Sequence, residues 1–271
     1  MIELKEVEKS IIKRYRKDIW SKFTRALKEY SLVNEGDKVA VAISGGKDSL
    51  LLAKLMQESQ KHGSIPFELE FIAMDPGFNK ENRKMLEKNC KLLNIPVKIK
   101  DSKVFAIANE ISKEQPCYMC ARMRRGFLYS FAEELGCNKL ALGHHFNDVI
   151  ETTMLNLFYA YEFKTMLPKV ESDNYENMEL IRPMYHIREK DILRYYKYIE
   201  LECMDCGCEV AAKTISSKRH ELKAWIAEYK KIHSDVDRSI FEAAMNVNMD
   251  AIGGFREDGI RRSYLDKKEK E

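Results

Sequence analysis

Apolar residues recur along the chain in two periods, one typical of strands and one typical of helices. Short apolar runs predict four β-strands, at Val39–Ile43, Phe67–Met74, Val97–Ile99 and Lys139–Gly143. Segments with helical spacing lie between and after these runs, at residues 48–62, 79–93, 104–112, 119–135 and 147–159. Strands that alternate with helices predict a parallel sheet whose two faces are covered by helices.

Residues 4–30 have a helical pattern of their own. Their apolar residues recur at spacings of three or four, at Leu4, Val7, Ile11, Tyr15, Ile19, Phe23 and Leu27. This spacing predicts one long helix with a single apolar stripe and with lysines and arginines on its other face.

The pattern weakens after residue 165. Residues 166–170 and 181–184 are predicted to be loops or edge segments. Further helices are predicted near residues 188–200, 214–231 and 235–248. The residues from Gly253 on are rich in glycine, arginine and lysine, and we expect them to be mobile.

The composition indicates a globular protein with ample material for a core. The chain has 271 residues, of which 45% are hydrophobic and 33% are charged. No run approaches the roughly 18 consecutive apolar residues of a membrane span. The first residues lack the apolar stretch of a signal peptide. We therefore expect no membrane association and a cytoplasmic location.

The charge is distributed unevenly along the chain. The formal net charge is +3, yet residues 1–30 alone carry nine Lys and Arg against five Asp and Glu. Such a basic segment suits nucleic-acid phosphates. It equally suits the solvated face of an amphipathic helix.

Residues 44–49 read Ser-Gly-Gly-Lys-Asp-Ser and lie between a predicted strand and a predicted helix. Glycines at a helix N-terminus let several backbone N–H groups point at one anion, and the helix dipole adds positive potential. The spacing is not that of the Walker motif. The sequence is identified as the signature of the ATP pyrophosphatases, the PP-loop family.

Seven cysteines are present, and most of them are clustered. Cys90 and Cys137 stand alone in apolar segments and are predicted to be core residues. The others form two groups, Cys117 with Cys120 and Cys203 with Cys206 and Cys208. In a reducing compartment such groups indicate metal binding rather than disulfides. Their spacing is compatible with a structural zinc site and with an iron–sulfur cluster.

Five further blocks follow the Ser-Gly-Gly-Lys-Asp-Ser loop in order, at residues 116–129, 143–161, 166–170, 181–189 and 203–207. Together they resemble the TtcA/TtuA group of tRNA thiolases, and in particular its tRNA 2-thiocytidine synthetase (TtcA) branch. The zinc-ribbon cysteines of the TtuA branch are absent. Two departures from the TtcA pattern are Asn147, where an acidic residue is usual, and Glu202, where proline is usual before the cysteine.

The resemblance implies a Rossmann-like, doubly wound parallel α/β sheet of the adenine nucleotide alpha hydrolase type, with an N-terminal helix and a helical C-terminal extension. It divides the chain into a basic helix (1–32), an ATP-binding α/β domain with the first cysteine pair (33–170), and a mostly helical region with the later cysteine (171–271).

The resemblance also implies a [4Fe-4S] cluster held by three cysteines. Carried over to this sequence, these are Cys117, Cys120 and Cys203. Cys206 is not among the implied ligands, and the resemblance assigns no role to Cys208. Ligation by three cysteines would leave one iron open for an exogenous sulfur.

In the implied nucleotide site, ATP lies on Ser44, Gly45, Gly46, Lys47, Asp48 and Ser49. Asp48 is expected to hold Mg²⁺, because carboxylate and phosphate oxygens suit this cation. The backbone of Met74 is expected to recognise adenine. A side chain at Gly143 would collide with the nucleotide.

Two further groups have both a functional and a structural interpretation. Asp148 is a second acidic group for the metal or the phosphates, or else a helix N-terminal residue with Asn147 as the cap. Arg124 or Arg125 would neutralise phosphate charge, or else contribute only surface charge. His144 and His145 are weaker candidates for proton transfer.

The implied reaction is ATP-dependent sulfur transfer to tRNA. A pyrimidine oxygen attacks the α-phosphate, pyrophosphate leaves, and sulfur delivered through the cluster replaces the adenylated oxygen. The catalytic set is Asp48, Arg124, Asp148, Cys117, Cys120 and Cys203. The donor would be sulfide or a persulfide carrier, and the enzyme would be a homodimer. We expect 2-thiocytidine as the product, with 2-thiouridine or a small acceptor as the alternative.

Overall fold

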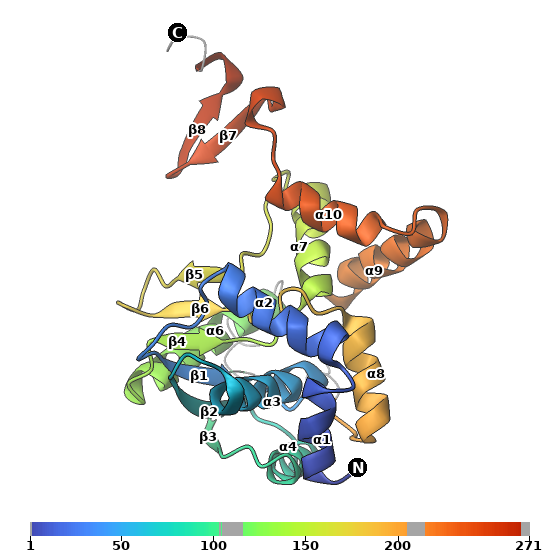
Figure 1. Cartoon of the computed structure of the whole chain (residues 1–271). Helices are drawn as coiled ribbons and strands as arrows, with labels where there is room; N and C mark the ends of the chain where they lie inside the picture. The colour runs from blue at the N-terminus through green and yellow to red at the C-terminus, as the bar shows by residue number, and fades with distance from the viewer. Residues whose placement is uncertain (1, 103, 105–115, 205–214, 267–271) are drawn as a thin grey trace.

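The computed structural model describes residues 2–102, 104, 116–204 and 215–266 and contains a central six-stranded sheet (Figure 1). The strands are β1 (Lys38–Ala42), β2 (Glu68–Asp75), β3 (Val97–Asp101), β4 (Lys139–Ala141), β5 (Lys169–Glu171) and β6 (Glu179–Ile181). Their order is β3-β2-β1-β4-β6-β5, and only β5 pairs antiparallel with its neighbour. The predicted fold class, a doubly wound and mainly parallel α/β sheet, is confirmed.

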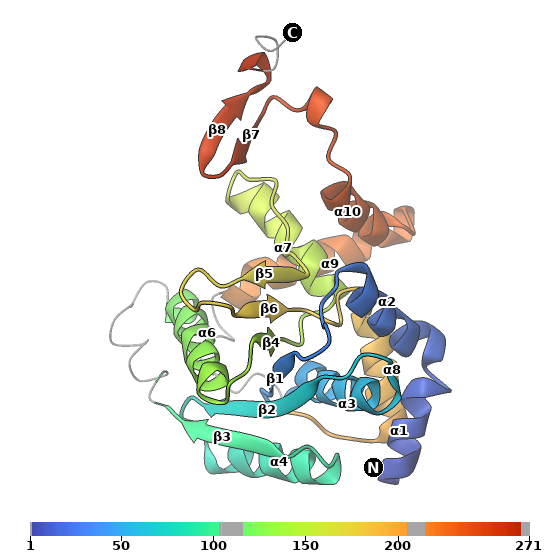
Figure 2. The same ribbon diagram turned by 60° about the vertical axis from the view of Figure 1, so that its left-hand side comes forward.

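Helices cover both faces of this sheet. The described helices are α1 (Leu4–Ile12), α2 (Ser21–Glu29), α3 (Lys47–His62), α4 (Lys80–Leu92), α6 (Pro116–Glu134), α7 (Phe146–Tyr159), α8 (Glu189–Ile199), α9 (Ile215–Ile232) and α10 (Val236–Met245). The last two pack against α7 and against each other. Figure 2 shows α6 on one face, with α3 and α8 on the other. In the described part of the chain, no helix is both long enough and apolar enough to cross a bilayer.

Alternating residues of the strands build two separate cores. In β1, Val39 and Val41 point to the larger core under α3, while Ala40 and Ala42 point to the smaller core under α6. The small alanines let α6 approach the sheet closely. This alternation is what a strand buried on both faces requires.

The strand order reverses between β1 and β4. The chain passes from β1 outward to β2 and β3 on one side, and then returns to β4 on the other. Ligands of doubly wound sheets bind at the carboxyl ends of the strands that flank such a switch point. Residues 44–49 follow β1, and residues 142–148 follow β4. The fold thus brings the two predicted loops together.

The predicted N-terminal helix is broken, and the prediction of one continuous helix is wrong. A π-helical segment, Arg16–Trp20, separates α1 from α2. The apolar residues of 4–30 have a mean spacing above 3.6, so their stripe would drift around a straight α-helix. The π-turn absorbs the extra residue, and Tyr15 then donates a hydrogen bond to Arg194 O at 3.0 Å.

Three other segments also differ from the prediction. Residues 254–257 and 260–263 form a hairpin, β7–β8, where a mobile tail was expected. Its turn is Asp258-Gly259 with positive φ at both residues. This dipeptide is a strong hairpin signal, but a prediction based only on the composition of the segment does not use it. Residues 179–181 form a strand inside the sheet, so Ile181, predicted to begin a loop or edge segment, lies in an inner strand. Residues 169–171 form the edge strand β5, in agreement with the prediction for residues 166–170. Helix α6 begins at Pro116, so Cys117 and Cys120 belong to its first turns. The predicted helix at 104–112 lies almost entirely outside the described residues.

Candidate functional site

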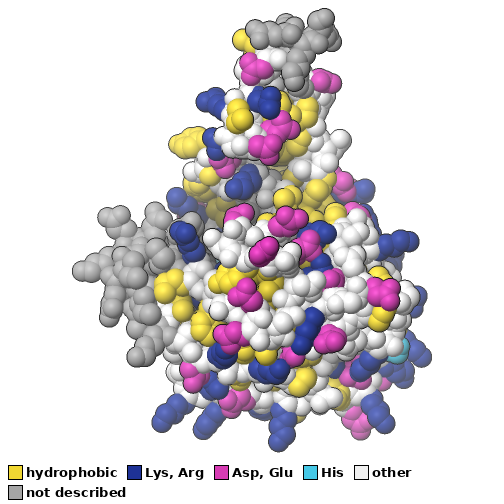
Figure 3. Space-filling model, turned by 90° about the vertical axis from the view of Figure 1, so that its left-hand side faces the viewer, with side chains coloured by type: hydrophobic (Ala, Val, Ile, Leu, Met, Phe, Trp, Pro, Cys, Tyr) yellow, Lys and Arg dark blue, Asp and Glu magenta, His cyan; other side chains and the backbone are white. Residues whose placement is uncertain are grey.

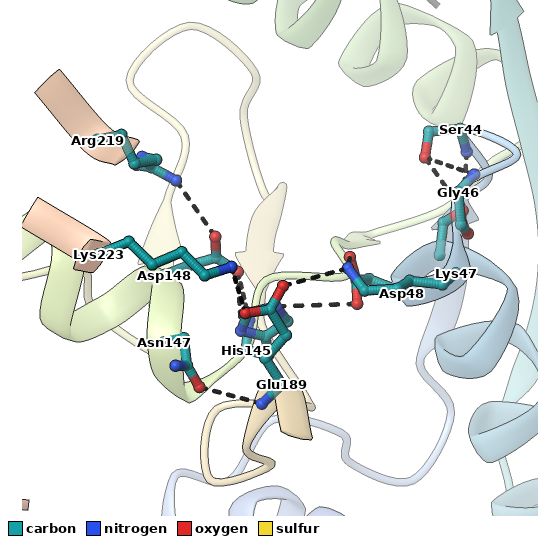
Figure 4. Close-up of polar contacts among 11 residues, drawn as sticks. Ser44, Gly46, Lys47, Asp48, His145, Asn147, Asp148, Glu189, Arg219 and Lys223 are labelled. Carbon is teal, nitrogen blue, oxygen red and sulfur yellow. Dashed lines mark hydrogen bonds and ion pairs between the residues drawn. The ribbon is translucent and has the colours of Figure 1, made fainter. Parts of the chain in front are cut away.

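The loop after β1 is braced by its own two serines. Ser49 Oγ accepts a hydrogen bond from Ser44 N at 3.1 Å and donates one to Gly46 O at 2.9 Å. Helix α3 starts at Lys47, directly after the glycines. Figure 4 shows Ser44 and Gly46 at the start of this helix. The loop is therefore preformed as a cradle at a helix N-terminus, which suits phosphate.

The loop is in direct contact with the second cysteine segment. Met204 N donates a hydrogen bond to Gly45 O at 3.2 Å. Gly45 has a φ of +86°, and a Cβ there would lie 2.4 Å from the Sδ of Met204. Only glycine meets both conditions without displacing that residue. Cys203 is thus one residue away from a backbone contact with the predicted ATP loop.

Gly143 follows β4 and packs against the start of α3. A Cβ at this position would lie 3.1 Å from Asp48 C and from Ser49 N. These are backbone atoms, so they have little freedom to give way. Glycine was predicted here because a side chain would collide with the nucleotide. The structure adds a second reason, because a side chain would also collide with the backbone at the start of α3.

Lys47 and Asp48 lie within a network of alternating charge (Figure 4). Lys47 Nζ is 2.9 Å from Asp48 Oδ2 and 3.6 Å from Glu189 Oε1. Burial acts to lower the pKa of Lys47, but the Asp48 and Glu189 carboxylates outweigh it and raise that pKa. The Lys47 ammonium group is therefore positively charged at neutral pH. Asp48 Oδ1 is buried and accepts no hydrogen bond within the described residues.

Asp148 lies in the first turn of α7 and has both carboxylate oxygens engaged. Oδ2 accepts the N–H of His145 at 2.9 Å, and Oδ1 lies 3.2 Å from Arg219 Nη1. Burial acts to raise the pKa of Asp148, but the neighbouring His145, its backbone N–H and Arg219 lower it below its ordinary value. The carboxylate is therefore ionised and positioned.

The residue that caps α7 is His145 and not Asn147, so that part of the prediction is wrong. Asn147 lies inside the first turn, and its Oδ1 accepts the N–H of Glu189 at 3.0 Å. Asn147 thereby ties the start of α8 to the start of α7. The neighbouring His144 is kept neutral at pH 7, because burial lowers its pKa to about 4.

The structure locates the remaining predicted residues less closely. Met74 is buried and next to last in β2, which ends at Asp75 and not at Met74 as expected. Arg124 is half-buried and Arg125 is exposed, both in α6. The side chains of Cys117 and Cys120 lie outside what the structure describes, and so do Cys206 and Cys208.

The predicted core cysteines and the cluster cysteine differ in their environment. Cys90 and Cys137 are buried, as predicted, and burial raises their thiol pKa to about 12 and about 11. Cys203 is half-buried, and its Sγ lies 3.9 Å from Leu201 O. Its neighbour Tyr196 is buried in the core. Of these three thiols, Cys203 is therefore the most accessible to solvent.

Sequence reasoning missed three charged residues of the site, namely Glu189, Arg219 and Lys223. Glu189 begins α8 and lies between Lys47 and Lys223. Arg219 and Lys223 are one turn apart on α9, and this i,i+4 spacing is the one signal they carry in the sequence. It places them on one face without showing that this face meets Asp148.

We predict that Glu151 makes stability depend on pH. Burial and the nearby Asp148 raise its pKa to about 7, against the effect of Arg219. The native state then binds the proton more tightly than the unfolded state, so stability falls as pH rises from about 4.5 through 7. Glu151→Gln should be more stable than the parent by about 2 kcal/mol at pH 8, and equal to it near pH 4.5.

Urea unfolding at the two pH values measures this difference. The control is Glu133→Gln, which changes an exposed glutamate on α6. A Glu151→Gln effect of the same size at both pH values would contradict the assigned cause.

Most of this chain is similar in sequence to known proteins. The PP-loop domain family (ATP_bind_3) matches residues 16–205. A tRNA-cytidine(32) 2-sulfurtransferase of Vibrio campbellii is 35% identical over 87% of this chain and 78% of its own length. The protein of the same name from Geobacter sulfurreducens is 33% identical over 86% of this chain and 91% of its own length.

A solved structure shows the same relation in three dimensions. The U34-tRNA thiolase NcsA from Methanococcus maripaludis, determined with its [4Fe-4S] cluster, aligns with a TM-score of 0.68. The alignment covers 87% of this chain and 80% of that protein, at 25% sequence identity.

Proposed function

We propose that this chain is an ATP-dependent tRNA sulfurtransferase that forms 2-thiocytidine. The proposal starts from its family, because the chain belongs to the tRNA-cytidine(32) 2-sulfurtransferases among the PP-loop proteins. The observation that carries the proposal is the hydrogen bond from Met204 N to Gly45 O. It joins the segment of Cys203 to the loop for ATP. Activation of the base and delivery of sulfur would then take place at one site.

ATP would bind along Ser44, Gly45, Gly46, Lys47, Asp48 and Ser49. The braced loop and the N-terminus of α3 would hold the phosphates, with Lys47 as the fixed positive charge. Met74 lies near the end of β2, at the same edge of the sheet, and its backbone would meet the adenine. Gly143 would keep the space beside the start of α3 free of a side chain.

Mg²⁺ would bind between Asp48 and Asp148. The chemistry of the donors fits, because carboxylate oxygens beside a phosphate site are the ligands that Mg²⁺ prefers. The buried Asp48 Oδ1 accepts no hydrogen bond among the described residues and lies 3.8 Å from His145 Nε2, so its lone pairs are available to a metal. The two aspartates would orient the triphosphate and offset its charge.

Cys117, Cys120 and Cys203 would hold a [4Fe-4S] cluster. Thiolates are the donors that such clusters use, and the half-buried Cys203 lies beside the ATP loop, so the observed residue fits the group. When bound, the cluster would supply the centre that carries sulfur to the activated base. Cys206 and Cys208 receive no role in this proposal.

The activating step depends on this chain's own charges. The pyrimidine oxygen forms a bond to the α-phosphorus, and the bond to the bridging oxygen breaks and releases pyrophosphate. Lys47 and the α3 dipole would stabilise the charge that develops on the phosphates. Arg124, half-buried in α6, would add a further positive charge there or hold tRNA phosphate.

The tRNA would bind along a basic groove between the N-terminal helices and the end of α3. We define this basic groove by Lys5, Lys9, Lys13, Arg16, Trp20 and Lys61, whose positive charges outnumber the negative charges of Glu8 and Glu58 in the same lining. The π-turn contributes Arg16 and Trp20, and such turns often occur at functional sites. The groove gives the basic residues of 1–30 a concave surface for RNA phosphates.

Neutralising Lys13 and Arg16 together to glutamine should weaken tRNA binding roughly tenfold at moderate salt and lower the salt slope by about 1–2. Both residues are exposed, so the fold should be unaffected. Filter binding over a range of salt concentrations measures both quantities. Lys84→Gln with Lys88→Gln, on α4, is the control with the same change of charge. Equal losses in the two variants would argue against the basic groove.

A second candidate product is 2-thiouridine. The alignment with a U34-tRNA thiolase over most of the chain favours this alternative. The higher identity to the cytidine-specific relatives favours 2-thiocytidine. Position 32 is carried over from the names of those relatives, and nucleoside analysis distinguishes the two products.

The remaining partners follow from the proposed chemistry. A sulfide or persulfide carrier would supply the sulfur, and the enzyme would act in the cytoplasm, where tRNA is available.

A second copy of the chain would cover exposed apolar residues near the end of α7, including Phe158, Tyr161 and Phe163. Apolar side chains lie on this part of the surface, below the hairpin (Figure 3). Light scattering that gives a monomer mass would contradict the dimer.

The proposed function is tested by anaerobic reconstitution with iron and sulfide. We expect the absorption of a [4Fe-4S] cluster and, with ATP and tRNA, thiolated nucleosides. A colourless protein that holds stoichiometric zinc would contradict the cluster, and the absence of thiolation by the cluster-loaded protein would contradict the activity.

A further inference from the structure

Helix α9 brings two cations to the nucleotide loop from a distant part of the chain. Arg219 Nη1 lies 3.2 Å from Asp148 Oδ1, and Lys223 Nζ lies 2.5 Å from Glu189 Oε2. The two residues are four positions apart, so they project from one face of the helix. Figure 4 shows both side chains reaching toward the group formed by His145, Asp148 and Glu189.

These contacts continue without a break to the predicted phosphate site. Glu189 Oε1 lies 3.6 Å from Lys47 Nζ, and Lys47 in turn binds Asp48. Lys223 is thus separated from the loop lysine by one carboxylate. Cations on α9 and the cation on α3 share the same set of acidic partners.

Mg²⁺ and ATP would compete with these partners for the same carboxylates and cations. Both oxygens of Asp148 are already engaged, one by His145 and one by Arg219. A metal at Asp148 would therefore compete with them for this carboxylate, and its charge would repel the Arg219 guanidinium group. The triphosphate also brings several negative oxygens, which compete with Glu189 for the ammonium groups.

Apolar contacts also hold α9 in place, independently of these ion pairs. Leu222 and Ile226 are buried against the core, and Trp225 packs edge-on against Phe158 at 6.0 Å between ring centroids. The Arg219 and Lys223 side chains are 38% and 46% exposed, and ion pairs at such exposure contribute little to stability. These cations are therefore free to exchange partners while the helix stays docked.

We propose that Arg219 and Lys223 bind the β- and γ-phosphates of ATP and hold the pyrophosphate as it leaves. When Mg²⁺ and ATP bind, Arg219 and Lys223 exchange Asp148 and Glu189 for phosphate oxygens. Asp148 is then available to the metal, and Glu189 is available to Lys47. The guanidinium group suits this role, because its planar fork donates two parallel hydrogen bonds to a phosphate. The inference rests on the proposed function for the identity of the nucleotide.

The test compares the binding of Mg·pyrophosphate, Mg·ATP and AMP to the full chain by titration calorimetry. Arg219→Gln should weaken pyrophosphate and ATP by about tenfold to a hundredfold and AMP by less than about twofold. Lys223→Gln should follow the same pattern with a smaller loss. Arg219→Lys keeps the charge without the fork and should give an intermediate affinity.

The matched control is Lys218→Gln. Lys218 is adjacent to Arg219, but its Nζ lies over the Tyr159 ring, 4.4 Å from the centroid. This variant should bind all three probes like the parent. Unchanged pyrophosphate affinity in Arg219→Gln would overturn the inference, and so would an equal loss for AMP and pyrophosphate. Should Arg219→Gln fail to fold, Arg219→Lys decides by the same comparison. None of these assays contains tRNA or a sulfur source, so a failure of the proposed thiolation leaves their outcome unaffected.

Discussion

Replacing Cys203 by alanine is expected to abolish tRNA thiolation while ATP binding is retained. Cys203 is half-buried, and the residue after it is hydrogen-bonded to Gly45 of the ATP loop. The loss of one of three proposed thiolate ligands should remove the cluster absorption and lower thiolation by more than about a hundredfold. The ATP affinity should change by less than about threefold, because Ser44–Ser49 keeps its internal hydrogen bonds.

Cys137→Ala is the matched control for this experiment. Cys137 is buried in the core under α6, away from the ATP loop. This variant should lose some stability, as core truncations do, but it should keep the full cluster absorption and thiolation activity per folded molecule. A Cys203→Ala protein that retains a complete cluster would exclude Cys203 as a ligand.

Replacing Lys47 by methionine is expected to give the opposite pattern. Lys47 is the fixed cation at the start of α3, and Asp48 and Glu189 raise its pKa, so it stays charged throughout the physiological range. Its loss should lower the rate of adenylation roughly a hundredfold to a thousandfold and weaken ATP binding. The cluster absorption should not change. Methionine retains most of the apolar stem of the side chain and limits the loss of packing.

Pyrophosphate release measured with tRNA and ATP reports this step directly. Lys84→Met, at an exposed lysine on α4, is the control. Cluster absorption and pyrophosphate release together separate the two machineries, because each variant should lose one and keep the other. A Lys47→Met protein with normal pyrophosphate release would remove Lys47 from the proposed mechanism.

Most of the sheet was predictable, because buried strands and amphipathic helices leave a clear period in the sequence. The runs at β1 and β2 and the helical spacing at α3 and α4 each extend over five or more residues. The strands β5 and β6 have three residues each and were not predicted, whereas β4, equally short, was recognised because its apolar run lies between two segments with helical spacing. The π-turn at Arg16–Trp20 was not predictable by a rule that counts spacings of three and four as one helix.

Residues of the candidate site could be predicted where one continuous segment carries them. The Ser44–Ser49 loop, Gly143 and Asp148 were identified from local motifs, and the fold brings these segments to the same edge of the sheet. Glu189, Arg219 and Lys223 were missed, because ordinary charged residues on helices give no signal of the partner they will meet. Arg219 reaches Asp148 across 71 positions of the chain, a contact that only the tertiary packing of α9 on α7 creates.

The most direct test of the proposed function is mass spectrometry of tRNA nucleosides from a strain that lacks this protein. We predict that 2-thiocytidine disappears from this strain, returns with a plasmid copy of the parent chain, and does not return with Cys203→Ala. An unchanged set of thiolated nucleosides in the deletion strain would contradict the proposal that this chain thiolates tRNA.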